Sequence, residues 1–178
     1  LVYFACSAIS RLATYKEIKA LLGRAGACEA IVEALRQHGQ VAPIAELACD
    51  AMCSLACSDD NIAILRRAGA SEAVVAALRQ HTAVLAVAVP ACCAIWVLSI
   101  GDNEQAVLVR VDACDAVVRA LLHHVSDARV ALQACGAICN LAINAHEVQA
   151  ALLRAGVCDA VVGALQQHMS IGLVVERA

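Results

Sequence analysis

Cysteine is the residue type with the most chemistry available to it in this 178-residue chain, because thiolates bind metals, attack electrophiles and form disulfides. The chain has eleven cysteines. One set recurs every 43 residues, at Cys6, Cys49, Cys92 and Cys135. A second set occupies another recurring position, at Cys28, Cys114 and Cys158, with Ser71 in the second place. Such spacing is typical of small side chains packed at fixed sites between helices.

Cys49, Cys53 and Cys57 are the strongest candidates for a metal site built from neighbouring cysteines. They lie at i, i+4 and i+8 on a predicted helix. At 1.5 Å per residue they span about 12 Å along the axis, so they cannot all bind one ion. Repeat-equivalent cysteines would lie about 10 Å apart in stacked helices. A disulfide needs Cα atoms about 4.4–6.8 Å apart. We therefore expect reduced thiols, no metal and no disulfide framework.

Histidines recur in the same way, at His38, His81, His124 and His168, each at the end of a predicted helix. His123 and His146 are isolated. A histidine at a helix C-terminus is favoured by the helix dipole when protonated, which is a structural role. The sequence contains no glycine-rich phosphate loop, no nucleophile elbow and no His-Glu-x-x-His motif. These absences predict a protein that is not an enzyme and has no cofactor.

The composition favours closely packed helices, because hydrophobic residues make up 62% of the chain and aromatic residues only 2%. Lysine and arginine number 13 against 16 acidic residues, for a net charge of −3. This balance argues against nucleic-acid binding, which needs a basic surface to neutralise phosphates. The N-terminus shows no basic segment before an apolar stretch. We therefore expect no signal peptide and a cytoplasmic location.

Two blocks of sequence recur in one register. The first block runs from Arg24 to His38 and returns at 67–81, 110–124 and 154–168. The second has the pattern Ala-Cys-x-Ala and begins at Ala5, Ala48, Ala91 and Ala134. Each unit of about 43 residues predicts a short helix, a left-handed turn, a second helix and a longer third helix. The left-handed turn is predicted at Gly26, Gly69 and Gly156, and Asp112 stands in the glycine place of the third copy.

An uncharged segment between His81 and Gly101 is near the length that crosses a bilayer. It falls in register with three copies of the second block that carry charges, and Pro90 interrupts its middle. The register predicts a buried third helix and no membrane span.

This pattern of three helices per repeat, with a Gly-Ala turn before the second, resembles the armadillo repeat. The resemblance covers essentially the whole chain and implies an all-α, right-handed superhelix with the third helices along a concave groove. It divides the chain into a preceding third helix at 1–13, repeats at 14–57, 58–100 and 101–143, and a truncated repeat at 144–178.

The resemblance also implies a binding site for an extended peptide on the third helices. In the family, an asparagine there grips the peptide backbone and a tryptophan four residues earlier stacks beside it. The asparagine position is occupied here by Arg11, Ser54, Val97 and Asn140. The tryptophan position is occupied by Ser7, Asp50, Cys93 and Gly136. We expect these side chains to be free of packing contacts. The segment that fits them best has an acid near Arg11, a base near Asp50, apolar residues in the middle and backbone amides near Asn140.

These features favour a non-enzymatic module that binds a partner protein, either an extended segment or another subunit. Two alternatives remain open: a regulatory or targeting arm of a kinase or ubiquitin ligase, and a structural component of a cytoskeletal or ciliary assembly. If flanking sequence covers the groove, the edge near His38, His81 and His124 is the alternative docking surface. Because the chain begins inside a repeat, we expect a fragment with uncovered apolar ends that can associate end to end.

Overall fold

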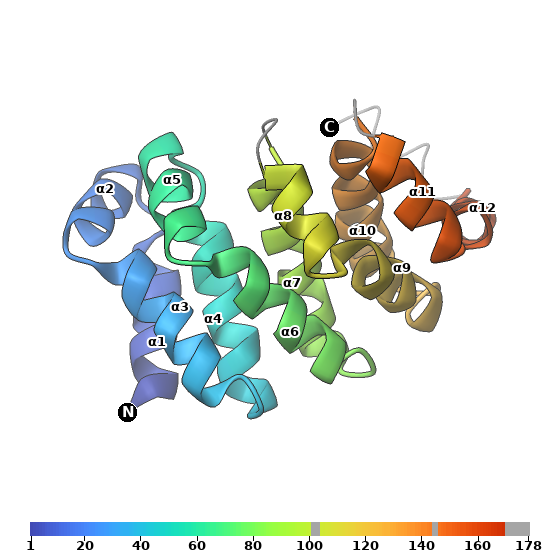
Figure 1. Cartoon of the computed structure of the whole chain (residues 1–178). Coiled ribbons are helices and arrows are strands. Elements are labelled where there is room, and N and C mark those ends of the chain that lie inside the picture. Colours follow the sequence, from blue (N-terminus) through green and yellow to red (C-terminus); the bar gives the residue numbers. More distant parts are fainter. Residues whose placement is uncertain (101–103, 144–145, 170–178) are drawn as a thin grey trace.

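The computed structural model describes residues 1–100, 104–143 and 146–169. These residues form twelve α-helices and no strand, which confirms the predicted all-α class. The helices follow the repeat. A short, a medium and a long helix recur in the same order along the chain, and the units succeed one another from left to right in Figure 1.

The long third helices form one continuous row. Their bounds are α1 (Val2–Leu12), α4 (Ala42–Leu55), α7 (Leu85–Leu98) and α10 (Ala128–Leu141). Each contacts the next in the series. The faces between them are lined by fully buried alanines such as Ala48, Ala91 and Ala134. Because alanine has the smallest apolar side chain, the helix backbones in this row can approach one another closely.

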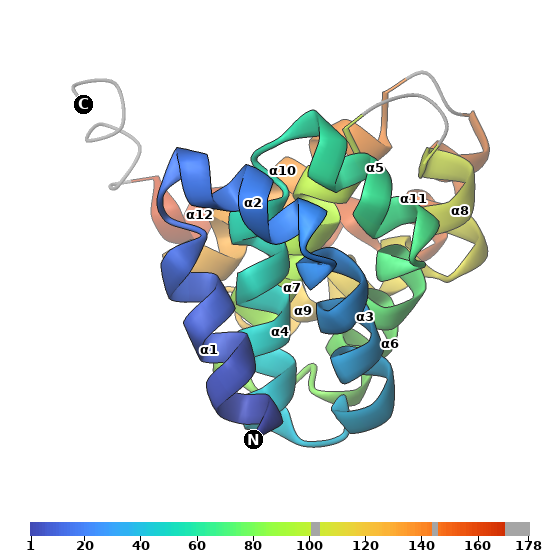
Figure 2. The ribbon, with the colours of Figure 1, turned by 90° about the vertical axis from the view of Figure 1, so that its left-hand side faces the viewer.

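The second helices form a parallel row that packs against the third helices. Their bounds are α3 (Ala27–His38), α6 (Ala70–Gln80), α9 (Ala113–His123) and α12 (Val157–His168). The first helices are α2 (Lys16–Arg24), α5 (Asp59–Arg67), α8 (Glu104–Arg110) and α11 (His146–Arg154). They lie across one end of both rows, at the top of Figures 1 and 2. The structure is therefore consistent with a helical repeat.

The left-handed turns predicted at the three glycines are present, and Asp112 adopts the same conformation. The backbone φ angle is +84° at Gly26, +79° at Gly69 and +85° at Gly156. Asp112, which replaces glycine in the third unit, has φ +59°. Asp is one of the few residues other than glycine that adopts this conformation readily. These turns connect each first helix to the second helix that follows it.

The apolar segment around Pro90 forms α7 and lies inside the helix stack, as the repeat register predicted. Val87, Ala91 and Ile95 on this helix are fully buried. Among the described residues, no single helix is long and apolar enough to cross a membrane, although α11 and α12 together reach that length across a 72° bend. The predicted final third helix, at 170–178, lies outside the described residues.

Candidate functional site

An open recess of about 650 Å³ lies on three successive third helices, α4, α7 and α10. We call it the third-helix recess. Its lining comprises Glu46, Leu47, Asp50 and Cys53 of α4, Leu85, Ala86, Val89, Pro90 and Cys93 of α7, and Arg129 and Gln133 of α10. No first or second helix contributes to this lining, so the row of third helices alone shapes the recess.

The charges at the third-helix recess are mainly negative. Glu46 and Asp50 lie one turn apart on α4 and both line it. Arg129 is the cation in this lining, and its guanidinium forms an ion pair of 2.8 Å with Asp127, the N-cap of α10. Asp127 therefore offsets most of the positive charge. The remaining carboxylates favour a cationic group in the recess.

The third-helix recess also presents unused hydrogen-bond acceptors. The Oε1 atom of Gln133 is buried and has no hydrogen-bond donor among the described residues. The carbonyl of Ala86 lacks its usual donor four residues later in the helix, because Pro90 has no N–H. A buried acceptor without a partner, such as Gln133 Oε1, is costly, so a bound group that donates a hydrogen bond to it would be favoured.

Of the eight residues predicted from the sequence, two line the third-helix recess: Asp50 and Cys93. The other six lie on the same row of helices but outside the lining. They are Ser7 and Arg11 on α1, Ser54 on α4, Val97 on α7, and Gly136 and Asn140 on α10. The structure thus brings the predicted residues onto one row but gathers only two of them at the recess.

Several of the predicted residues are engaged by neighbouring helices, contrary to the expectation that they are free of packing contacts. Ser10 Oγ donates a hydrogen bond to Asp50 Oδ2. The ring of Trp96 covers Gly136 so closely that a Cβ atom there would lie 2.6 Å from it. The Asn140 amide donates to the Trp96 carbonyl oxygen at 3.3 Å. These positions form the junctions between successive third helices.

Sequence reasoning missed the recess residues that lie one turn nearer the N-terminus of each third helix, such as Glu46, Val89 and Gln133. The predicted positions came from the resemblance, which directs attention to the middle of the helix. The internal proline of α7 was the available signal, because it frees a carbonyl at the turn before it.

All eleven cysteines are free thiols in the structure. Burial raises the pKa of the Cys49 thiol, and it raises the pKa of Cys92 to about 12. A group of three metal-ligating side chains is absent from the described part of the chain. Five of the seven repeat-equivalent cysteines are buried, as packing residues are, whereas Cys135 is half-buried and Cys158 is exposed.

Three of the repeated histidines make equivalent hydrogen bonds between successive units, at the ends of the second helices. His81 Nε2 donates to the Gly39 carbonyl oxygen at 2.7 Å, and His124 Nε2 to that of Thr82 at 2.8 Å. His168 repeats the contact with Val125 at 2.8 Å. Each imidazole thus fastens one unit to the loop of the unit before it.

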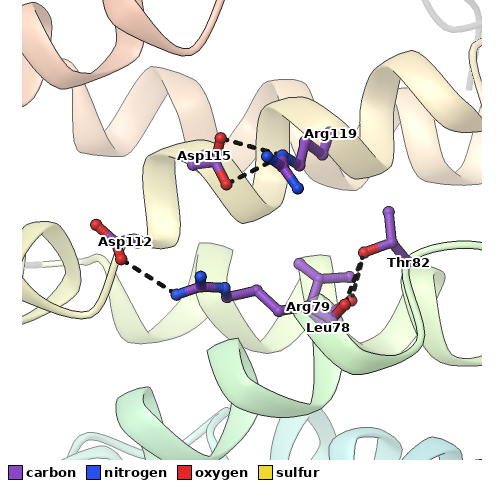
Figure 3. Close-up of polar contacts among 6 residues, drawn as sticks. All are labelled: Leu78, Arg79, Thr82, Asp112, Asp115 and Arg119. Atoms are coloured by element: carbon purple, nitrogen blue, oxygen red, sulfur yellow. Dashed lines mark hydrogen bonds and ion pairs between the residues drawn. The ribbon is translucent and has the colours of Figure 1, made fainter.

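An exposed ion pair also joins successive units along this edge (Figure 3). Arg79 on α6 extends to Asp112 at the corner before α9, with 3.1 Å between Nη1 and Oδ2. Arg119 pairs with Asp115 one turn away on α9 itself. The side chains of both ion pairs remain substantially exposed to solvent.

Comparison with protein-family models finds no match, and comparison with curated proteins finds no relative. A solved structure is similar in fold: the crystal structure of an engineered protein from the Northeast Structural Genomics Consortium. The TM-score is 0.75 at 24% sequence identity, and the match covers 89% of this chain. The chain spans 64% of the length of that structure. At this level of identity the similarity concerns the fold, which is an all-helical stack.

Proposed function

We propose that the chain is a protein-interaction module of the armadillo type, which binds an extended segment of a partner protein in the third-helix recess. The observation that carries the proposal is that three successive third helices contribute to one open recess. A site spread along a row of repeats suits an extended chain better than a compact small molecule.

The lining indicates the chemistry of the segment. Leu47, Leu85 and Val89 provide apolar surface for apolar side chains. Glu46 and Asp50 favour a lysine or arginine beside them, because Arg129 is already paired with Asp127. Gln133 Oε1 and the Ala86 carbonyl would accept hydrogen bonds from the backbone N–H groups of the segment.

Selection from random peptides tests the proposal and does not require a natural partner. A library of displayed peptides would be panned on the immobilised protein, and the affinity of the selected peptides measured by calorimetry. We expect sequences that combine a basic residue with apolar neighbours.

The variant Glu46→Lys should weaken these peptides about tenfold, if one partly desolvated charge pair of roughly 1.4 kcal/mol is lost and replaced by repulsion. The matched control is Glu33→Lys, the same charge change at an exposed position on α3. Equal affinity for wild type and Glu46→Lys, combined with loss of binding in His81→Glu, would move the site to the edge of second helices.

A further inference from the structure

Two junctions between successive third helices share a contact in which a residue on one helix meets the residue 40 positions later on the next. Ser10 of α1 donates a hydrogen bond to Asp50 of α4. The Trp96 ring of α7 covers Gly136 of α10. The middle junction, between α4 and α7, places Cys53 opposite Cys93 at the same separation in sequence. Two of the three junctions thus contain packing or hydrogen-bonding groups, and the third contains two thiols.

Direct contacts confirm that the two thiols are neighbours. Cys53 Sγ lies 3.3 Å from the carbonyl oxygen of Pro90, which is one turn before Cys93 on α7. The Cys53 and Cys93 thiols lie close enough to influence each other's ionisation. Both residues line the third-helix recess, and Cys93 is only half-buried. A small reagent can therefore reach the pair from solvent.

The environment makes the two thiols unequal. Cys53 donates its S–H to the Pro90 carbonyl oxygen at 3.3 Å, which favours its protonated form. The neighbouring Cys53 thiol lowers the pKa of Cys93, against the opposing effects of burial and of Asp50. The Cys93 thiol and burial raise the pKa of Cys53. Cys93 is thus the thiol that ionises first, and thiolates are the reactive form of cysteine.

We propose that Cys53 and Cys93 form a peroxide-reactive thiol pair, in which Cys93 is the nucleophile and Cys53 closes a disulfide that joins α4 to α7.

The chemistry balances with a hydroperoxide as the oxidant. The Cys93 thiolate attacks one oxygen of hydrogen peroxide, the O–O bond breaks, and the departing hydroxide takes a proton to become water. Cys93 is then a sulfenic acid. Cys53 attacks the Cys93 sulfur, the S–O bond breaks, and the Cys53 proton leaves with the hydroxide as a second water. Two thiols lose two electrons in total, and one peroxide is reduced to two waters.

Other cysteines of the chain provide internal comparisons. Cys49 and Cys92 lie in the same region but are fully buried. Cys57, Cys139 and Cys158 are exposed. Exposure alone would make these three react first. If Cys53 and Cys93 act as a pair, the half-buried Cys93 should instead react before the three exposed thiols.

The experiment treats the dilute protein with hydrogen peroxide, blocks the remaining thiols with iodoacetamide and maps the products by mass spectrometry without reduction. We expect one dominant cross-linked peptide pair that contains Cys53 and Cys93. The variant Cys93→Ser should lose this product. Cys53→Ser should instead leave a sulfenic acid on Cys93 that dimedone traps. Cys139→Ser, which changes an exposed thiol, should form the cross-link as the wild type does.

The first repeat has serine at both equivalent positions: Ser10 corresponds to Cys53, and Ser7 corresponds to Cys93. We therefore expect the protein to tolerate both cysteine-to-serine substitutions. The double variant Cys53→Ser, Cys93→Asp reproduces the Ser10–Asp50 pair. It should fold with the same helical circular dichroism and form no cross-link in this region.

Oxidation of Cys57, Cys139 or Cys158 before Cys93 would overturn the proposal. So would a folded Cys53→Ser protein whose Cys93 forms no dimedone adduct.

Discussion

The indole ring of Trp96 on α7 lies against the backbone of Gly136 on α10, and a Cβ atom at residue 136 would approach two ring carbons to 2.6 Å. Position 136 lies inside α10, where glycine is less favourable than alanine. The contact with Trp96 on the neighbouring helix is therefore the reason for the glycine at this position. The contact fixes how closely α7 and α10 pack.

The variant Gly136→Ala should destabilise the protein, because the added methyl group displaces the tryptophan ring. Overpacking of this kind costs about 1–3 kcal/mol, which exceeds the gain of about 0.5–1 kcal/mol from replacing glycine in a helix. Urea unfolding followed by circular dichroism measures the change. The control is Gly163→Ala on α12, where the new Cβ would meet only Val125 at 3.8 Å. That variant should be more stable than the wild type, and similar effects at both positions would contradict the packing described for Trp96.

Asn61 on α5 is buried and joins two units. Its Nδ2 donates to the Lys19 carbonyl oxygen at 3.2 Å and to that of Leu55 at 3.1 Å. Substitution by alanine leaves both carbonyls without this donor, at an expected cost of about 1–3 kcal/mol. Thermal and urea unfolding should show the loss. The variant Gln166→Ala, at an exposed position on α12, should unfold as the wild type does.

Asp127 gives the stability a specific pH dependence. Hydrogen bonds from the Arg129 side chain, and from the backbone N–H groups of Val130 and Arg129, lower its pKa to about 2. The pKa in the unfolded chain is about 3.9. The stabilisation by Asp127 is thus complete above the unfolded pKa and is lost as the pH falls toward 2.

The variant Asp127→Ala should be less stable by about 0.5–2 kcal/mol at pH 7, as for the loss of other helix caps. The difference from the wild type should narrow steadily from pH 5 to pH 2. Unfolding curves at several pH values measure it. A difference that stays constant or widens in acid would show that the Asp127 carboxylate is not stabilised as described.

The two ends of the helix stack expose large apolar side chains. Phe4 on α1 is 75% exposed, and Leu165 on α12 is 65% exposed. We expect the chain to associate end to end as its concentration rises, which sedimentation velocity would detect. Phe4→Glu combined with Leu165→Glu should restore the monomer. The control Leu122→Glu changes an exposed leucine on α9, which has a second helix on either side, and should leave the association unchanged.

The repeat pattern predicted the helices well because each unit carries its own start and stop signals. The repeat predicted a short first helix and a longer third helix in each unit, as α5 (Asp59–Arg67) and α10 (Ala128–Leu141) illustrate. The left-handed turns were also predictable, since few residues other than glycine adopt that conformation. These features depend on local sequence alone.

The contacts between units could not be predicted in the same way. Equivalent positions lie 43 residues apart, but Ser10 and Asp50, which meet across two third helices, lie 40 apart. This offset depends on the crossing angle and stagger of two helices, which side-chain packing sets. The Cys53–Cys93 pair and the recess were missed for this reason, and the engagement of Asn140 by the Trp96 carbonyl was missed with them.

The proposed function depends most on the third-helix recess being the surface that binds the partner segment. The direct test is a nuclear magnetic resonance titration of the labelled protein with the tightest selected peptide. We predict that the largest shift changes occur at Leu47, Val89 and Gln133, on the three helices that line the recess. Shift changes centred on His81 and His124, with these three residues unmoved, would contradict the account.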